Sequence, residues 1–197
     1  MRNKNVRILT DCAVMVALAF ALSCIKLFQM PLGGSVTLAS MLPIMLISVK
    51  HGSKIGLGAG FMYSLAQLAQ ALIEGDVFPY CETIDLLILC VICDYLLPFT
   101  ALGLAGIFKD TRVIKSEEIA CYVGFGAVIF ARFICHFITG AAIWGQWAPD
   151  GMGKYLYSLL YNGSYLGMDL LICLVVSVVM LRSGEIRRLV GLDAQAK

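Results

Sequence analysis

Long apolar runs recur along the chain, each bounded by charged residues or by glycine and proline. About 20 such residues are what a helix needs to cross the hydrocarbon core of a bilayer. The first run begins at Ile8 and has no clear small-residue cleavage site, so we interpret it as a retained span and not a removed signal peptide. Hydrophobic residues make up 60% of the 197 residues, more than a soluble domain of this size can bury. The chain is therefore predicted to be an integral membrane protein.

The expected fold is all-α, with residues 1–197 forming one transmembrane domain of six membrane-spanning helices. The predicted spans are about 8–28, 36–50, 54–74, 84–107, 118–144 and 156–181. The second is short and flanked by Pro31, Gly33 and Gly34, which leaves its start open. No stretch is polar enough for a separate soluble domain, and no solenoid-type repeat is present.

Basic residues are distributed unevenly between the two ends of these spans, and lysine and arginine in short loops mark the cytoplasmic side of a membrane protein. One side holds Arg2, Lys4, Arg7, Lys50, Lys54, Lys109, Arg112, Lys115, Arg182, Arg187, Arg188 and Lys197. The other holds only Lys26 and Lys154 and is otherwise acidic: Glu74, Asp76, Glu82 and Asp85. Both termini are therefore expected in the cytoplasm. The net charge is only +2, and the basic residues are spread along the chain and not massed on one face, so the charge gives no indication of nucleic-acid binding.

Charged side chains also occur inside two predicted spans, where they are costly and usually face a cavity or a partner. The fourth span contains Asp94, followed by Tyr95. The fifth contains Arg132 and His136, and Gly140 follows at the same four-residue step, so these three lie along one helix face. Gly140 would leave room for a ring to approach that face.

Aromatic and amide side chains are expected at a similar depth. Trp144 ends the fifth span, while Tyr157, Tyr161 and Asn162 begin the sixth. Three helices would thus present a carboxylate, an imidazole, a guanidinium, an amide and several aromatic rings. Such a set suits a small polar ring compound, which stacks on aromatic faces and is oriented by a few polar groups.

Each of these residues also has a purely structural interpretation. Asp94 and Arg132 could form a buried ion pair, and His136 could be a core histidine. Trp144 and Trp147 could belong to the interfacial aromatic belt, which we prefer for Trp147. The combination of these groups on neighbouring faces nevertheless favours a binding site. Two further polar residues within spans, Gln67 and Asp169, are given no role.

Small residues at four-residue spacing form ridges that allow close approach of another helix. The first span has such a ridge at Ala13, Ala17 and Ala21, and the third has one at Gly56 and Gly60. For the glycines we expect packing within the monomer.

The eight cysteines lie almost wholly within apolar runs, where free cysteine behaves as a small hydrophobe. Cys90 and Cys93 form a single Cys-x-x-Cys pair without a nearby histidine, so core packing is favoured over a metal site. The chain has no phosphate-binding Gly-x-x-x-x-Gly-Lys-Ser/Thr loop, no His-Glu-x-x-His element and no Gly-x-Ser-x-Gly element. We therefore expect no enzyme activity, no cofactor and no metal. Without two inverted halves, a self-sufficient secondary transporter is disfavoured.

Three stretches carry a resemblance to a known family: LASMLPIMLISVKHG from Leu38, DYLLPFTALGLAGIF from Asp94 and HFITGAAIWGQWAPDGMGKYLYSLLYNGSYL from His136. Together they resemble the thiamine-specific substrate-binding (S) subunits of energy-coupling factor (ECF) transporters, the ThiT/YuaJ family. The similarity covers nearly the whole chain and has the same six-helix layout. It implies a high-affinity thiamine binder in a prokaryotic plasma membrane, which docks on one transmembrane scaffold subunit and two ATPase subunits.

The resemblance also implies specific ligand contacts. They fall on His136, Gly140, Trp144, Tyr157 and Asn162. An acidic–tyrosine pair falls on Asp94 and Tyr95, with Asp where at least one member has Glu, and a basic contact falls on Arg132, where that member has Lys.

Elsewhere the resemblance assigns a docking ridge and shows a departure. Ala13 and Ala17 match the ridge that contacts the scaffold subunit in the family. The family's loop before the second helix supplies a tryptophan and a glutamate, but the matching positions here are Gly34 and Leu38, so the lid over the ligand must differ. Tyr80 is a further candidate contact.

The chemistry of thiamine agrees with this set. Its thiazolium cation favours aromatic faces, tryptophan above all. Its aminopyrimidine offers donors and acceptors that a carboxylate and an amide can meet, and Asp94 would offset part of the desolvation of the cation. Two alternatives stay open: an S subunit for another vitamin or a thiamine precursor, and a proton-coupled secondary transporter that uses Asp94 and His136.

Overall fold

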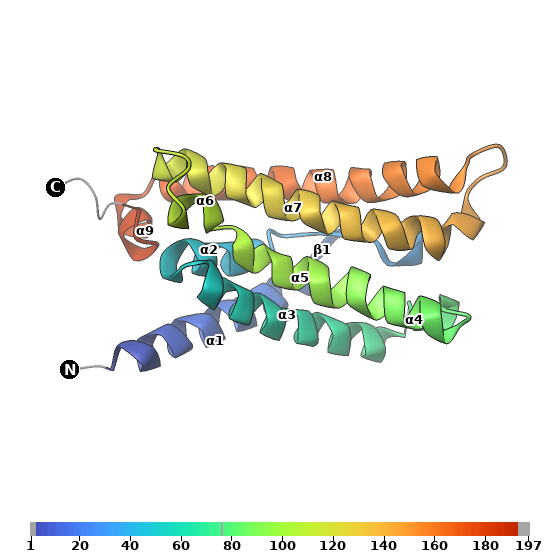
Figure 1. Ribbon diagram of the computed structural model, residues 1–197, viewed down its shortest axis with the longest axis horizontal. Helices are drawn as coiled ribbons and strands as arrows, with labels where there is room; N and C mark the ends of the chain where they lie inside the picture. The colour runs from blue at the N-terminus through green and yellow to red at the C-terminus, as the bar shows by residue number, and fades with distance from the viewer. Residues whose placement is uncertain (1–2, 76, 193–197) are drawn as a thin grey trace.

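Long helices packed side by side form an elongated bundle (Figure 1). The computed structural model describes residues 3–75 and 77–192, so the predictions made for Arg2, Asp76 and Lys197 lie outside the described residues. The long helices are α1 (Lys4–Ser23), α3 (Ser53–Glu74), α7 (Glu117–Ala142) and α8 (Lys154–Leu181). The shorter ones are α2 (Leu42–His51), α4 (Ile84–Cys90), α5 (Leu97–Ala101), α6 (Ile107–Asp110) and α9 (Gly184–Leu189).

The direction of the chain alternates along the bundle. Helices α1, α3 and α7 run away from the end that holds the termini, whereas α2, the series α4 to α6, and α8 run back (Figure 1). The described basic residues that we assigned to one side belong to the helix ends and turns at that end. At the opposite end lie the turns that join α3 to α4 and α7 to α8.

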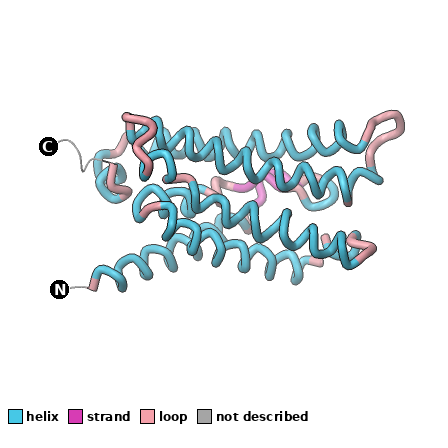
Figure 2. Tube along the Cα trace, viewed as in Figure 1, coloured by secondary structure: helices cyan, strands magenta, loops and turns pink. Residues whose placement is uncertain are grey.

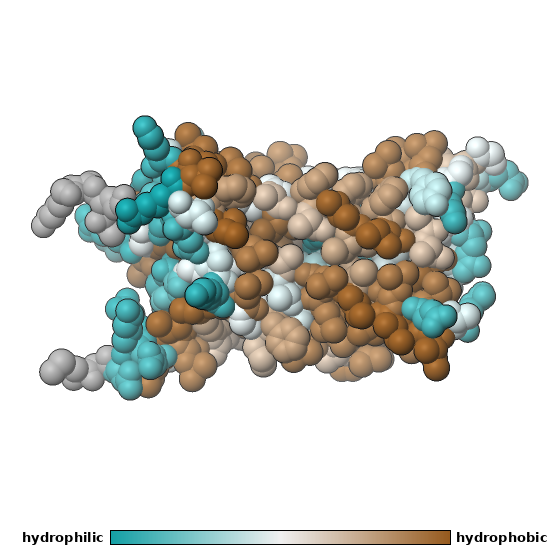
Figure 3. Space-filling view, in the orientation of Figure 1, coloured by the Kyte–Doolittle hydropathy of each residue, from teal (hydrophilic) through white to brown (hydrophobic). Residues whose placement is uncertain are grey.

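On the face shown in Figure 3, the surface between the two ends is mostly apolar, as a bilayer requires. Among the described residues, four segments are long and apolar enough to cross a membrane: Lys4–Ser23, Ile84–Asp110, Glu117–Ala142 and Lys154–Leu181. The chain is thus a membrane protein, but the prediction of six spanning helices is not confirmed. Helix α3 has 22 residues, and a rise of 1.5 Å per residue makes it long enough, but it is less apolar than the other four.

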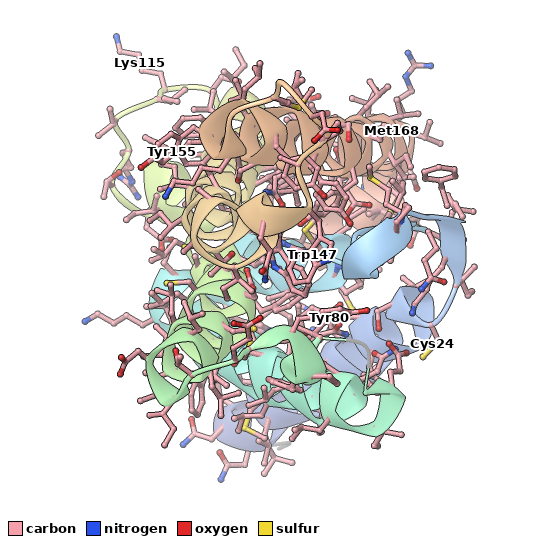
Figure 4. All side chains as sticks on the ribbon, turned by 90° about the vertical axis from the view of Figure 1, so that its right-hand side faces the viewer. Cys24, Tyr80, Lys115, Trp147, Tyr155 and Met168 are labelled. Carbon is pink, nitrogen blue, oxygen red and sulfur yellow. The ribbon has the colours of Figure 1, made fainter. Side chains whose placement is uncertain are left out.

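The second predicted span, 36–50, is wrong in its extent. Lys26–Gln29 (β1) and Ser35–Thr37 (β2) instead form an antiparallel hairpin around the short 3₁₀ turn Pro31–Gly33 (η1), so the all-α prediction needs this correction. Gly33 has φ 97°, which a glycine tolerates and which turns the chain back. Helix α2 then starts only at Leu42 and has 10 residues, too few to cross a bilayer. Figures 2 and 4 show the hairpin beside the long helices, between α1 and α8.

The fourth predicted span is interrupted near its middle. Helix α4 is followed by a π-helical segment, Val91–Leu96 (η3), and then by α5, the 3₁₀ turn Leu102–Leu104 (η4) and α6. Pro98 explains the break, because proline has no N–H to donate to the carbonyl of Asp94 four residues earlier and its ring crowds that carbonyl. The wider turn contains Asp94 and Tyr95, and π-helical turns are frequent at functional sites.

Helix α2 lies in the core of the bundle, with every residue from Leu42 to Val49 buried. Close packing around it depends on glycine: a Cβ at Gly56 would lie 2.3 Å from the Gly103 carbonyl oxygen, and one at Gly60 would lie 2.8 Å from that of Thr100. The prediction that Gly56 and Gly60 pack within the monomer is confirmed.

Of the four membrane-capable segments, α1 is covered least, with 11% of its apolar window buried. Ala13, Ala17 and Ala21 are all exposed, so this ridge makes no close packing contact inside the monomer.

Candidate ligand-binding site

A cavity of about 150 Å³ lies toward the end of the bundle opposite the termini. Its walls come from α3, the η3–α5 segment, α7, α8 and the hairpin. Among the predicted site residues it is lined by Asp94, Tyr95, Arg132, His136, Trp144 and Asn162. Two predicted residues, Gly140 and Tyr157, are not among the described residues that line it.

Asp94 and His136 meet in the wall between η3 and α7. His136 Nδ1 lies 2.9 Å from Asp94 Oδ1, and the Thr139 hydroxyl donates to the same oxygen. Both side chains are nearly buried, at 10% and 11% exposure. Asp94 therefore uses one carboxylate oxygen to hold α7.

Arg132 completes a relay with this pair. Its Nε–H donates to His136 Nε2 at 3.1 Å, so that nitrogen has no proton and Nδ1–H must donate to Asp94. The imidazole in this arrangement is neutral, and the charges of Arg132 and Asp94 balance each other across it. A relay of this kind fixes the orientation of the carboxylate in the wall of the cavity.

The Arg132 guanidinium is also held by apolar and soft partners. Its carbon lies 4.4 Å from the centre of the Phe99 ring, and Nη1 lies 3.0 Å from the Met41 sulfur. Stacking of a guanidinium on an aromatic face is favourable where water is excluded. These contacts keep the charge at the wall of the cavity, deep among α2, α5 and α7.

Asn162 and Gly140 lie in the seam between α7 and α8. Asn162 Nδ2 lies 3.0 Å from the carbonyl oxygen of His136 and 3.0 Å from that of Ser158. A Cβ at Gly140 would lie 2.2 Å from the Ser158 hydroxyl oxygen, so the glycine lets α8 approach α7. The room beside Gly140, which we expected to be open to a ring, is taken by Ser158 and Asn162. A ligand contact at Gly140 stays a prediction.

Aromatic rings close the cavity toward the end of the bundle. Trp144, in the 3₁₀ turn Trp144–Trp147 (η5), lies 5.3 Å from the Tyr80 ring and 5.7 Å from that of Trp147. Figure 4 shows Tyr80 and Trp147 near the middle of this end. Their ring centres lie 5.2 Å apart. Trp147 does not line the cavity with Trp144, and its role in the interfacial belt stays a prediction. Tyr95 lies on the other side, stacked on Phe78 at 5.8 Å.

Tyr161 was in our aromatic set but was given no role, and the structure places it between α8 and the hairpin. Its hydroxyl accepts from the Gly34 backbone N–H at 3.0 Å and donates to the Pro31 carbonyl oxygen. Gly34 must be small, because a Cβ there would lie 2.7 Å from the same hydroxyl oxygen. Tyr157 packs on Tyr161 at 5.7 Å. Tyr161 therefore holds in place the turn that borders the cavity. Gly34 in this turn is one of the two positions at which we expected the lid to differ from that of the family.

Asp169 and Gln67, which had no predicted role, both line the cavity. Asp169, 2% exposed, accepts the backbone N–H of Thr37 at 2.9 Å and so ties β2 to α8. Gln67 donates to the Ser23 hydroxyl at 2.8 Å, which joins α3 to the end of α1.

Sequence reasoning missed several lining residues. Thr139 and Tyr165 could have been predicted from the sequence, because they follow His136 and Asn162 by three residues and so share their helix faces. Lys26 and Glu74 could not have been predicted in this way, because the contact between their side chains depends on how the hairpin folds.

The site combines a fixed carboxylate, a neutral imidazole, an amide and aromatic faces within a partly open cavity. Such groups can orient a ring by hydrogen bonds and stack on it. Among the described residues no group of three or more histidine, cysteine, aspartate or glutamate side chains could hold a metal ion.

Comparisons with known proteins identify the family. The model of the thiamine transporter protein family (Thia_YuaJ) matches residues 9–187. The thiamine transporter ThiT of Bacillus subtilis is 32% identical over 188 residues, which cover 89% of this chain and 90% of that protein. The ThiT of Lacticaseibacillus paracasei is 27% identical and covers 91% of this chain and 89% of its own. A solved structure of ThiT from Listeria monocytogenes has the same fold, with a TM-score of 0.71, 24% identity and coverage of 93% and 98%.

The family match spans nearly the whole chain, including every helix that lines the cavity. The cavity described above therefore lies within the part of the chain that the family shares. The protein belongs to the Thia_YuaJ family of thiamine transporter proteins.

Proposed function

We propose that this protein is the thiamine-binding S subunit of an ECF importer, which captures thiamine from outside the cell and delivers it with an ATP-driven module. The observation that carries the proposal is the position of Trp144 and the Asp94–His136 pair in one cavity. The indole offers a face to a cationic ring, and the carboxylate offers an acceptor to the amino group of the pyrimidine. The relatives named above are thiamine transporters, which supports the same ligand.

The orientation proposed for the protein places the cavity at the outer face of a bacterial plasma membrane. The described basic residues gather at the end that holds the termini, and short basic loops favour the cytoplasm. Thiamine would then enter between η5 and the turn around Tyr80, and both termini would lie inside.

The ATP hydrolysis that drives transport would come from other subunits, since the sequence has no nucleotide-binding loop. We propose the transmembrane scaffold subunit and the two ATPases of an ECF module as partners, with Ala13 and Ala17 as the docking ridge. In support, both alanines are exposed on α1, the least covered of the four membrane-capable segments. Small exposed residues at this spacing let a second helix approach closely.

Titration of the purified protein with thiamine tests the binding step. Calorimetry and quenching of tryptophan fluorescence should both report saturable binding, because Trp144 borders the cavity. Riboflavin and the isolated aminopyrimidine ring serve as comparison ligands. Tighter binding of either would overturn the thiamine assignment in favour of another vitamin or a precursor.

Uptake into proteoliposomes tests the coupling. Accumulation of thiamine should require the ECF module and internal ATP. If the protein alone accumulates thiamine on a proton gradient, the S-subunit proposal is wrong and Asp94 and His136 become candidates for proton coupling.

A further inference from the structure

A second polar wall of the cavity lies on its α3 side. It consists of Gln67, Gln70 and Glu74 on α3 together with Ser23 and Lys26. The three α3 residues follow one another at steps of three and four positions, so they share one helix face. Hydrogen bonds connect them, as Gln67 reaches Ser23 and Gln70 Nε2 donates to Glu74 Oε1 at 2.8 Å.

Glu74 ends this wall in an ion pair that crosses from α3 to the hairpin. Lys26 Nζ lies 3.4 Å from Oε1 and 3.3 Å from Oε2 of Glu74. The two side chains are 26% and 37% exposed, and the separation is longer than the 2.7 Å between Lys50 and Asp11. A loose, partly exposed pair of this kind contributes little to stability, so another cation can replace the lysine at small cost.

The charges around the cavity leave one carboxylate in excess. Asp94, Asp169 and Glu74 line it against the cations Lys26 and Arg132, while His136 is neutral in its hydrogen-bonded form. The cavity therefore suits a ligand that carries a positive charge.

Of the three carboxylates, Glu74 is the one placed to meet such a charge. The charge of Asp94 is already balanced by Arg132 across His136, and Asp169 is 2% exposed and bound to Thr37. The nitrogen of a thiazolium ring has no proton to donate, so it needs a nearby negative charge and not an oriented acceptor. Glu74 can supply that charge while Gln70 continues to hold its Oε1 atom.

We propose that Glu74 is a further ligand-binding residue, which faces the thiazolium of thiamine, and that Lys26 is the counter-ion that the ligand's cation replaces. The inference rests on the proposed function and adds a specificity element to it. Recognition of the pyrimidine belongs to the wall of Asp94 and His136, whereas recognition of the positive charge belongs to the wall of Glu74.

Binding of two ligands to matched variants tests this division. The ligands are thiamine and its uncharged fragment 4-amino-5-hydroxymethyl-2-methylpyrimidine, both titrated by calorimetry. Glu74→Gln should weaken thiamine binding about tenfold, equivalent to about 1.4 kcal/mol, and leave the fragment unaffected. Lys26→Met should strengthen thiamine binding, because it removes a competing cation. Glu82→Gln is the control, since Glu82 is an exposed carboxylate that does not line the cavity.

Three results would overturn the inference. Equal losses for both ligands in Glu74→Gln would mean that Glu74 acts through the fold, and unchanged thiamine affinity would mean that it has no role. Weaker thiamine binding in Lys26→Met would mean that the Lys26–Glu74 ion pair holds the binding site in shape and is not displaced by the ligand. Wild-type protein that binds no thiamine overturns the proposed function as well, whereas wild-type binding with an inert Glu74 overturns only this inference.

Discussion

Asp94 and His136 are 42 positions apart in the chain, yet the carboxylate and the imidazole lie 2.9 Å apart between η3 and α7. Arg132 approaches the far side of the same ring, so three side chains from two segments form one connected unit. The contact depends on the π-helical turn that contains Asp94. A charge placed there can bind a ligand and hold the two segments together at the same time.

Removal of that charge should therefore impair both binding and stability. Asp94→Asn keeps the size of the side chain but leaves Arg132 without its balancing charge, and loss of one partner of a buried pair costs about 3–5 kcal/mol. We expect thiamine affinity to fall more than tenfold and the melting temperature in detergent to drop. Asp94→Glu keeps the charge and should retain most of the binding. Equal behaviour of the Asn and wild-type proteins would refute the relay.

The two tryptophans should differ in their effect on binding. Stacking of a cation on a desolvated indole contributes about 2 kcal/mol, so Trp144→Ala should weaken thiamine binding by more than about tenfold. Trp147→Ala is the matched variant, because Trp147 is 38% exposed and does not line the cavity. Calorimetry gives both affinities. Similar losses in the two variants would mean that the aromatic cluster acts as a whole.

The Tyr161 hydroxyl should control how fast the ligand leaves. Tyr161→Phe removes the bonds to Gly34 and Pro31, and each hydrogen bond contributes about 1 kcal/mol, so release should accelerate roughly fivefold or more. Stopped-flow tryptophan fluorescence measures the rate. Tyr155→Phe, an exposed tyrosine on the same helix, should leave it unchanged. Unaltered release from Tyr161→Phe would show that this turn does not limit exit.

Two glycines of α3 offer a test of packing in the core. Gly56→Ala places a methyl group against the Gly103 backbone, and overpacking of this kind costs about 1–3 kcal/mol. Gly58→Ala meets nothing within 4 Å and should be neutral or slightly stabilising, because alanine favours helix. Thermal unfolding in detergent compares them. A Gly56→Ala protein as stable as the Gly58→Ala protein would contradict the close approach of α3 to η4.

The exposed ridge of α1 should matter for transport and not for binding. Ala13→Trp combined with Ala17→Trp adds bulk where a scaffold helix is proposed to dock, so calorimetric thiamine affinity should persist while ATP-driven uptake fails. Leu171→Trp with Val175→Trp is the control, an exposed pair at the same spacing on α8. Normal uptake by the Ala13/Ala17 variant would show that the ridge is not a docking surface.

Sequence periodicity predicts the long helices well, because runs of apolar residues bounded by charges describe α1, α7 and α8 directly. It misplaces the chain between Lys26 and Leu42, since strands of four and three residues are too short to show a clear alternating pattern. It also misses the break at η3, where a single proline changes the helix type over six residues.

Spacing within one helix likewise finds only part of the site. The step from Arg132 to His136 predicts a shared face, and these side chains do form one hydrogen-bonded unit with Asp94. The same spacing suggests open room at Gly140, but Ser158 and Asn162 of the next helix occupy it. The pairing of Lys26 with Glu74 depends on the fold of the hairpin, which no periodicity reveals.

The short, buried helix α2 has a consequence for how the chain is made. Ten residues cannot hold a segment across a bilayer, so the machinery that inserts membrane proteins has no stable span to recognise between α1 and α3. The stretch from Lys26 to His51 packs mainly on α1, α3, η4 and α8, so we expect it to reach its place once these elements are present. Since this stretch also forms one side of the cavity, the binding site should be completed as the last step of biogenesis, after the C-terminal helices have left the ribosome.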